Sequence, residues 1–402
     1  MKIAIIGAGA AGCFAAANIP KRNDREVVVF EKAAKALQKV KISGGGRCNV
    51  THQLFDVKEL LQKYPRGKNF LKKTLHSFSP AETLQWFAAK GVSIKAEADG
   101  RMFPDTDDSQ TIIDCLWTAM RQNGVTVQFQ KSLQRIEKVK EQWYLSFADG
   151  SQYIADKVLI ACGGYPKEEQ YHWLRSLGHT IHAPVPSLFT FNLPHHPITA
   201  LMGLSVSNAQ VKIGSTKIVE QGPILITHWG LSGPAILRAS AWGAQEIHQL
   251  QYQFTARINW LGTTTDHELS TWIQDKRQYE GSRFIHERND WGLPKRLWEY
   301  LMDEAGIADN TKWGELKSSN QHKLIELLLR HNYNVSGKTT HKDEFVTCGG
   351  VATNEINPET MESKLAPGLY FAGEILHVDG ITGGFNFQHA WSSGFLFAKN
   401  FQ

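Results

Sequence analysis

The fold is decided by residues 2–12, "KIAIIGAGAAG". The first five residues are apolar and rich in isoleucine, which predicts a strand buried on both faces of a parallel sheet. Gly7, Gly9 and Gly12 follow in G-x-G-x-x-G register, and the residues after them read as a helix that ends by Pro20. A strand, a glycine turn and a helix in this order predict a dinucleotide-binding unit.

Each glycine of this motif has a separate physical task. Gly7 permits the tight turn, Gly9 lets the backbone approach a pyrophosphate, and Gly12 lets helix and strand pack closely. The helix begins at Ala10 and Ala11, where free N–H groups and the positive end of the helix dipole favour phosphate. We therefore expect the glycine turn and the first helical residues to bind the cofactor.

A second apolar strand, "EVVVFEK" (26–32), ends in Glu31 and Lys32. Glu31 lies 19 residues after Gly12 (31 − 12), where a carboxylate can accept hydrogen bonds from ribose hydroxyls and disfavours a 2′-phosphate. The alternative is a structural glycine turn without a ligand. This half of the site does not distinguish NAD from FAD.

The C-terminal segment indicates which dinucleotide is bound. "GLYFAGE" (368–374) predicts a buried strand that ends in Gly373 and Glu374, and "DGITGGFNFQHAWSSG" (379–394) predicts a tight loop that leads into a helix. The N-terminus of such a helix stabilises negative charge on the pyrimidine end of a flavin. Both ends of an FAD are thereby accounted for. The residues expected to bind it here are Gly373, Glu374, Asp379, Gly380, Gly384, Phe385 and Asn386.

The middle of the N-terminal part supplies a third contact. Helices are predicted over 79–91 and 108–124, and a β-meander turns near Asp149-Gly150 before a buried strand. That strand closes on "ACGG", which resembles the glycine-rich strand end that lies against the cofactor in flavoproteins of the two-dinucleotide-binding type. The expected contacts are Ala161, Gly163 and Gly164.

The stretch "KISGGGRCNV" (41–50) has three readings: a flexible tether, a thiol or metal site, or a cradle for an anion. It follows the Glu31 strand on the cofactor side, so we expect the backbone of Gly44, Gly45 and Gly46 to lie against the cofactor. Arg47 could neutralise a phosphate or orient a substrate anion, and Asn49 could bond the cofactor or the loop. Cys48 is expected to pack near the flavin, with a catalytic thiol as the alternative.

Residues 188–339 interrupt this pattern. Short alternating strands dominate 188–264, and helical patterns dominate 265–339. We therefore predict a Rossmann-like FAD-binding domain of α/β class, formed by 1–187 and 340–402, with an inserted β-barrel-like and helical domain. Within the insert, "THWGLSGPAIL" (227–237) reads as a turn into a helix. His228 there is a candidate acid–base or substrate-binding group, or else a packing residue.

Composition sets the remaining limits. The 402 residues favour more than one domain, and the net charge of +5 favours anionic ligands without arguing for nucleic acid. The five cysteines form no C-x-x-C pair, so we expect no metal site, no disulfide framework and a reducing, cytoplasmic location. No stretch approaches the ~20 apolar residues of a membrane span.

Taken together, "GAGAAG", "KISGGGRCNVT", "GRMFPDT", "THWGLSGPAIL", "VTCGGV" and "LYFAGEILHVDGITGGFNFQHAWSSG" resemble the HI0933-like (YhiN/BaiN-type) family of FAD-binding oxidoreductases. The resemblance runs through nearly the whole chain and implies FAD as cofactor. One departure is "LHVDG", where His377 stands in place of an acid. Family activities include reduction of conjugated C=C bonds in steroid-type enones and conversion of a ribosomal RNA uridine to dihydrouridine.

Three functions therefore compete. The first is a reductase that passes hydride from flavin N5 to a conjugated C=C, with His228, His377 or Cys48 as the acid and Arg101 as a substrate contact. No second glycine fingerprint is evident, so NADH or NADPH would bind transiently as electron donor. The second is an RNA-modifying flavoenzyme that uses the basic segment 58–73, with Tyr64 and Phe70 stacking on bases. The third is a redox sensor or an oxidase. The substrate, the electron donor and the oligomeric state stay open.

Overall fold

The computed structural model describes residues 1–287, 289–339 and 346–402. The chain divides into two compact units, which are described separately. Unit 1 consists of Met1–Ser187 and His341–Gln402, and unit 2 of Leu188–Thr340.

Unit 1 is built on a five-stranded parallel sheet in the order β20-β10-β1-β2-β6. The central strand β1 is buried along nearly its whole length, as its run of isoleucines predicts. The strands are β1 (Lys2–Ile6), β2 (Glu26–Phe30), β6 (Thr126–Gln128), β10 (Lys157–Ile160) and β20 (Leu369–Phe371). The chain leaves β1 toward β2 on one side and returns to β10 on the other, so the carboxyl ends of β1 and β10 flank a topological switch point. Ligands bind at such points in open α/β sheets.

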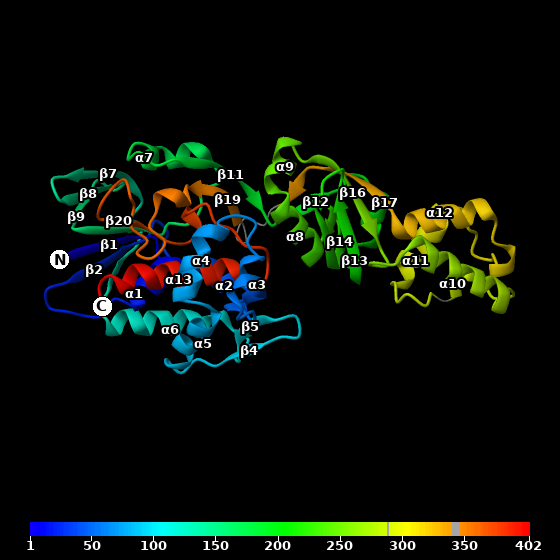
Figure 1. The fold of residues 1–402 in the computed structure, drawn as a ribbon, viewed down its shortest axis with the longest axis horizontal. Helices are drawn as coiled ribbons and strands as arrows, with labels where there is room; N and C mark the ends of the chain where they lie inside the picture. Colours follow the sequence, from blue (N-terminus) through cyan, green and yellow to red (C-terminus); the bar gives the residue numbers. More distant parts are fainter. Residues whose placement is uncertain (288, 340–345) are drawn as a thin grey trace. The chain divides into compact units, whose positions relative to one another are not determined.

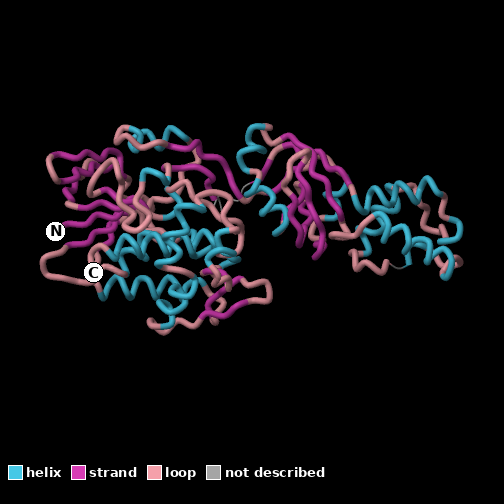
Figure 2. Tube along the Cα trace, viewed as in Figure 1, coloured by secondary structure: helices cyan, strands magenta, loops and turns pink. Residues whose placement is uncertain are grey.

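Helices from both ends of the chain pack together in unit 1. The blue helix α1 (Ala10–Ala17) lies beside the red helix α13 (Phe385–Lys399), and α6 (Ser109–Gln122) also packs on α1 (Figure 1). Figure 2 shows these helices next to the strands of the parallel sheet. Gly394 on α13 makes the approach possible, because a Cβ there would lie 2.6 Å from the carbonyl oxygen of Ala11.

The predicted local signals of unit 1 are present. Helix α5 (Pro80–Ala88) begins with a capping box formed by Ser79 and Glu82. The meander consists of β7 (Leu133–Val139), β8 (Gln142–Phe147) and β9 (Gln152–Ala155). Further elements are α2 (Gln38–Gly46), β3 (Thr51–His52), α3 (Val57–Leu61), α4 (Lys68–Ser77), β4 (Ile94–Ala96), β5 (Arg101–Pro104), η1 (Glu168–Tyr171), α7 (His172–Arg175), β11 (Ile181–Ser187), β19 (Val346–Val351), η5 (Thr353–Glu355) and η6 (Gly373–Ile375).

Unit 2 contains a seven-stranded sheet in the order β17-β16-β13-β14-β15-β12-β18. The edge strands β17 and β18 are joined by Gly337 alone, so the sheet curls until its two edges meet there, which makes it barrel-like. The strands are β12 (Thr190–Asn192), β13 (Ser205–Ile213), β14 (Val219–Thr227), β15 (Gly230–Ser232), β16 (Gln253–Asn259), β17 (His331–Ser336) and β18 (Lys338–Thr339).

The helices of unit 2 share a core with this sheet. They are η2 (Pro197–Leu201), α8 (Pro234–Trp242), α9 (Ala244–Gln249), α10 (Asp266–Tyr279), η3 (Ile285–Glu287), α11 (Lys295–Glu304), η4 (Trp313–Glu315) and α12 (Ser318–Leu329). One cluster of buried apolar side chains runs from Phe189 to Val335 and includes members of both the sheet and the helices.

The sequence assigned 265–339 to a helical subdomain, but its last residues belong to the sheet. In β17, "HNYNVS", buried and exposed residues alternate strictly, with His331, Tyr333 and Val335 inside. This period of two is typical of a strand with one buried face. The stretch is too short to outweigh the helical pattern before it.

Candidate cofactor and active site

The glycine turn after β1 leaves room for a ligand at one of its three glycines. A Cβ on Gly7 would lie 2.4 Å from the carbonyl oxygen of Ala161, and one on Gly12 would lie 2.0 Å from that of Gly7. A Cβ on Gly9 would meet no atom of the described residues within 4 Å. Gly7 and Gly12 therefore serve packing, whereas Gly9 faces open space at the start of α1. This is what a pyrophosphate at the helix N-terminus requires.

Glu31 forms hydrogen bonds with the loop after β1 and with the loop after β2. Its Oε2 accepts the N–H of Ala8 at 2.8 Å, and its Oε1 accepts the N–H of Ala33 at 2.8 Å. A carboxylate offers about four acceptor positions, so these two bonds leave lone pairs for ribose hydroxyls. Beside it, the ammonium of Lys32 lies 5.6 Å from the ring centre of Tyr165.

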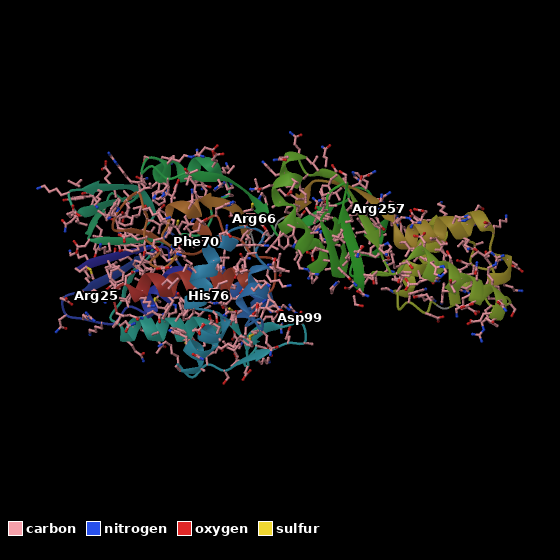
Figure 3. All side chains as sticks on the ribbon, in the orientation of Figure 1. Arg25, Arg66, Phe70, His76, Asp99 and Arg257 are labelled. Carbon is pink, nitrogen blue, oxygen red and sulfur yellow. The ribbon has the colours of Figure 1, made fainter. Side chains whose placement is uncertain are left out.

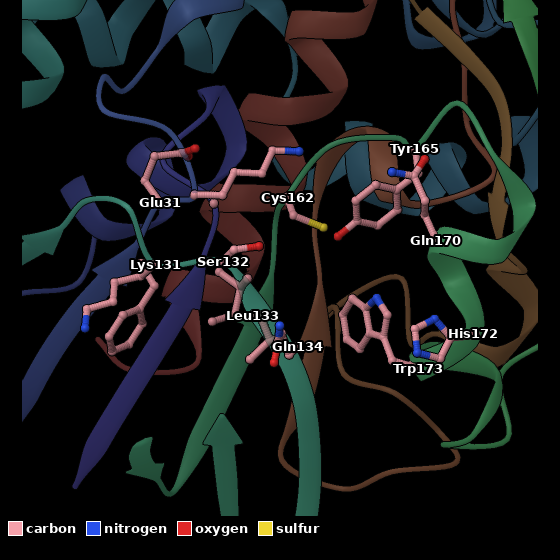
Figure 4. A pocket seen from close by; sticks show the side chains of 14 residues that line it. Glu31, Lys131, Ser132, Leu133, Gln134, Cys162, Tyr165, Gln170, His172 and Trp173 are labelled. Atoms are coloured by element: carbon pink, nitrogen blue, oxygen red, sulfur yellow. The ribbon is translucent and has the colours of Figure 1, made fainter. Parts of the chain in front are cut away.

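A cavity of about 590 Å³ opens beside Glu31 (Figure 4). This volume is in the range of small-molecule and cofactor sites. It is lined from the strand ends of β1 and β2, from the start of β7, and from the segment that follows β10. The lining residues are Ile6, Gly7, Phe30, Glu31, Lys32, Lys131, Ser132, Leu133, Gln134, Cys162, Tyr165, Gln170, His172 and Trp173.

Of these lining residues, sequence reasoning found Gly7, Glu31 and Lys32 and missed the rest. Tyr165 lies in the irregular segment after the "ACGG" strand end, Trp173 lies in the short helix α7 that follows it, and Lys131 lies in the loop before the meander. Their only sequence signal is that they follow strands whose carboxyl ends form the site. That rule names a loop but does not select the residues within it.

The glycines of "KISGGG" interrupt α2 and form a second open surface. Gly44, Gly45 and Gly46 have φ angles of 59°, 71° and 86°, which favour glycine. Phe103 blocks the Cβ position of Gly44 at 2.9 Å, but at Gly45 and Gly46 a Cβ would touch none of the described atoms within 4 Å. The backbone there is accessible to a ligand, as expected for a cradle.

The residues after the glycines are bonded within the protein. Arg47 pairs with Glu97 (Nη1–Oε1 2.6 Å) and lies 4.0 Å from the ring centre of Phe103. With its amide turned to satisfy both groups, Asn49 accepts the N–H of Gly384 at 3.0 Å and donates to the carbonyl oxygen of Thr51. Asn49 therefore bonds the loop, one of the two roles considered, and connects β3 to the start of α13.

The strand ends β10 and β20 converge on Glu374. Its Oε2 lies 2.7 Å from the Nζ of Lys39, and its Oε1 accepts the N–H of Thr347 at 2.9 Å. Gly163 has a φ of 76° and faces this carboxylate, and Gly164 packs on Thr347. The N–H of Gly373 is held by Ser393 of α13 at 2.9 Å.

Two polar residues before and within α13 have side chains that are bonded within the protein. Asp379 is fully buried and accepts hydrogen bonds from Arg66 (Nε–Oδ1 2.6 Å) and from Ser187 (Oγ–Oδ2 3.1 Å). Asn386 bonds both backbone groups of Gly380, at 2.8 and 2.9 Å. Both side chains shape the loop at the N-terminus of α13, and the predicted contact of these two residues with the cofactor stays a prediction. Gly384 is the N-cap residue of this helix, with a φ of 91°, and its N–H is the group that Asn49 accepts.

The four predicted catalytic and substrate residues lie in different environments. Burial raises the pKa of the Cys48 thiol to about 12, and the side chain is fully enclosed. Burial, His182 and Arg66 lower the pKa of His377 to about 4, and its ring stacks on His182 at 4.0 Å. A thiol with so high a pKa and an imidazole that is neutral at pH 7 are both poor acids for protonating a substrate carbon.

His228 belongs to unit 2, where it is exposed in the turn between β14 and β15 beside the ring of Trp229. Arg101 is paired with Asp99 (Nε–Oδ2 2.7 Å) and with Glu97 (Nη2–Oε2 2.9 Å). The guanidinium of Arg101, predicted from the sequence to contact the substrate, is therefore bonded within the protein.

These features fit an FAD. Open backbone at Gly9 suits a pyrophosphate, Glu31 suits a ribose, the cavity beside it suits an adenine, and the open glycines 45 and 46 leave room for the remainder. Among the residues that the structure describes, no helix has the length and hydropathy to span a membrane.

Known proteins resemble the chain over nearly its whole length. It is 28% identical over 407 aligned residues to the 3-dehydro-bile acid delta(4,6)-reductase of Clostridium scindens (98% of this chain and 97% of that protein). It is 30% identical to the ribosomal RNA dihydrouridine synthase of Escherichia coli (98% and 96%). The structure of 3-ketosteroid-delta4-(5alpha)-dehydrogenase from Rhodococcus jostii shares the fold, with a TM-score of 0.51, 13% identity, and coverage of 98% and 96%. A model of the HI0933-like protein Rossmann domain matches residues 1–400, and the chain therefore belongs to the HI0933-like family of FAD-dependent oxidoreductases.

Proposed function

We propose that this protein is an FAD-dependent reductase that saturates a conjugated C=C bond of a small molecule carrying an adjacent carbonyl group. The observation that carries the proposal is the match over 98% of the chain to a bile acid reductase of this family. The open glycine cradles and the cavity beside Glu31 support it.

The chain would hold FAD along the carboxyl edge of the parallel sheet. Gly9, Ala10 and Ala11 would receive the pyrophosphate, Glu31 the ribose, and the cavity beside Tyr165 the adenine. Gly45, Gly46 and the N-terminus of α13 would face the flavin, whose reduced form supplies hydride from N5. Ala161, Gly163 and Gly164 would close the site from the β10 side.

The chain itself must bind the substrate, exclude water and hold a proton for the α-carbon. Cys48 is a poor proton donor because burial makes its thiol a very weak acid, and His377 is a poor one because its imidazole is neutral at pH 7. His228 stays a proposed donor, because its side chain is exposed in the turn between β14 and β15. We also propose a reducing cytoplasmic location, since no disulfide joins the cysteines of the described residues.

The electron donor is proposed to be NADH or NADPH that binds transiently. Anaerobic mixing of the purified yellow protein with NADH, NADPH and dithionite, followed by a conjugated 3-oxo steroid acid, tests the reaction. We expect one of the three reductants to bleach the flavin absorbance and the steroid to restore it. A protein that binds FAD but is reduced by none of them is a sensor, and a colourless protein refutes the cofactor assignment.

A second candidate is reduction of uridine in ribosomal RNA, supported by 30% identity to a synthase with that activity. The basic segment 58–73 supports it less well than its sequence indicates. Tyr64 is fully buried and Phe70 is 6% exposed, so the expected base stacking by these rings is wrong. Arg66, which is labelled in Figure 3, is paired with Asp379.

The exposed lysines Lys58, Lys72 and Lys73 are left on this surface, and Lys73 lies 3.3 Å from Glu359. The discriminating experiment is to count dihydrouridine in ribosomal RNA from a deletion strain. A missing dihydrouridine that returns with the wild-type gene would favour the RNA reaction over the small-molecule reaction. An unchanged count would exclude it.

A further inference from the structure

His52 lies at the N-terminus of α13 and is not among the site residues predicted from the sequence. Its ring stacks on that of Phe385, the first residue of α13, with ring centres 4.9 Å apart and planes 20° apart. A Cβ on Gly383 would lie 3.5 Å from its Cδ2. The imidazole therefore lies where the proposed function places the pyrimidine end of the flavin.

The backbone that carries His52 is fastened to α13. The indole N–H of Trp391 donates to the carbonyl oxygen of Val50 at 2.9 Å. The hydroxyl of Thr51 donates to Oε1 of Gln388 at 2.6 Å. Because both contacts join the β3 segment to the first two turns of the helix, the imidazole is held in a fixed place relative to the helix N-terminus.

One nitrogen of His52 is buried without a partner. Its Nδ1 has no hydrogen bond within the part of the chain that the structure describes. A buried polar atom in that state costs about 1–3 kcal/mol. Such a cost is seldom retained unless a ligand or water completes the bond, so the orphaned nitrogen points to a group that binds beside the His52 ring.

The surroundings of His52 keep it neutral at pH 7. Burial is the main cause that lowers its pKa below the usual 6.5, and Lys63 and Arg101 lower it further. Asp99, through its backbone carbonyl and its charge, acts in the opposite direction. A new negative charge beside the ring would raise this pKa, because an opposite charge favours the protonated form.

We propose that His52 is part of the cofactor site and takes up one proton from water when the bound FAD is reduced. This inference rests on the proposed function. Reduction brings two electrons from dithionite or a reduced nicotinamide together with one proton, and the site gains one negative charge. The proton on His52 offsets that charge, so the imidazolium and the helix N-terminus act together on the same end of the cofactor.

The proton count on reduction tests this. The midpoint potential of the FAD-loaded protein is measured against pH, between about pH 7 and 8.5, where the oxidised protein holds His52 neutral, by equilibration with reference dyes. Because His52 is neutral before reduction and charged after it, we expect about two protons per two electrons in the wild type and about one in His52→Gln. His76→Gln, at an exposed histidine of α4 (Figure 3), is the matched control and should keep the wild-type count.

An equal count in the wild type and His52→Gln would overturn the inference. If His52→Gln does not retain FAD, an indicator dye in unbuffered solution is used to count the protons that the wild type takes up on reduction. A count of about one proton per two electrons would also overturn the inference. A colourless wild-type protein refutes the proposed function instead. A yellow wild-type protein that takes up one proton refutes the role of His52 alone.

Discussion

The ion pair between Arg66 and Asp379 gives the strongest stability prediction. The carboxylate is fully buried and the Arg66 side chain is 11% exposed. Arg66→Met removes the charge but keeps the length, and leaves Asp379 with Ser187 as its remaining bonded side chain. Breaking a buried pair by removing one partner costs about 3–5 kcal/mol. For a unit of this size, about 2–4 °C is lost per kcal/mol, so Tm should fall by roughly 6–20 °C.

The loss should also depend on pH. Burial is the main cause that raises the pKa of Asp379, and Arg66 opposes it. Without Arg66 the folded-state pKa rises further above the unfolded value, so the folded protein binds the proton more tightly and stability falls as pH rises between the two values. Calorimetry at pH 5 and pH 8 should therefore show the larger loss at pH 8.

The matched control is Arg135→Met, which removes an arginine that is 69% exposed and paired with Glu137. An exposed pair contributes about 0–1 kcal/mol. If Arg66→Met lowers Tm no more than this control does, or lowers it equally at both pH values, then Arg66 does not stabilise the buried carboxylate.

Three further predictions address the site and the core. Gly9→Val should weaken FAD binding at least about tenfold, some 1.4 kcal/mol, with little change in the Tm of the FAD-free protein. Gly12→Val should instead unfold the protein, because a Cβ there lies 2.0 Å from the carbonyl oxygen of Gly7. A fluorescence titration with FAD and a melting curve distinguish the two effects. Phe70→Ala should lower the free energy of unfolding by about 3–5 kcal/mol because the ring is buried. Unchanged stability together with a loss of RNA binding would instead indicate that Phe70 stacks on a base. Burial holds the pKa of His331, His377 and His389 near 4 in the folded protein, so the unfolding free energy should decrease as pH falls from about 6.5 toward 4, and a flat profile by urea titration would contradict this.

Local patterns predicted the parts of the fold that local physics determines. The strand, glycine turn and helix of residues 2–17, and the capping box at Ser79, depend on neighbouring residues. Their periodicity is therefore visible in a single sequence. The start of the insert at residue 188 was predicted from a change to short alternating strands, and unit 2 begins at Leu188.

Side-chain partners were not predictable because they come from distant parts of the chain. Arg47 pairs with Glu97, 50 positions away, and Arg66 pairs with Asp379, 313 positions away. Nothing in the spacing of "GGGRCN" or "HVDG" indicates those partners. The motifs identified the segments that meet at the strand ends, but which side chains within them face the cofactor stays a prediction.

The pairing of these cations bears on the kind of substrate. Arg47, Arg101, Arg66 and Lys39 each lie against a carboxylate, so an anionic substrate would have to displace an existing partner to use any of them. Arg101 is the most accessible of the three arginines, with 40% of its side chain exposed, and both of its partners are also partly exposed, so its pairs would be the least costly arginine pairs to open. A neutral enone requires no such exchange, since its carbonyl can be polarised by backbone N–H groups such as those of the open glycines. The arrangement of charges therefore favours a substrate whose reacting end is uncharged, and any phosphate or carboxylate it carries would bind away from the reacting carbon.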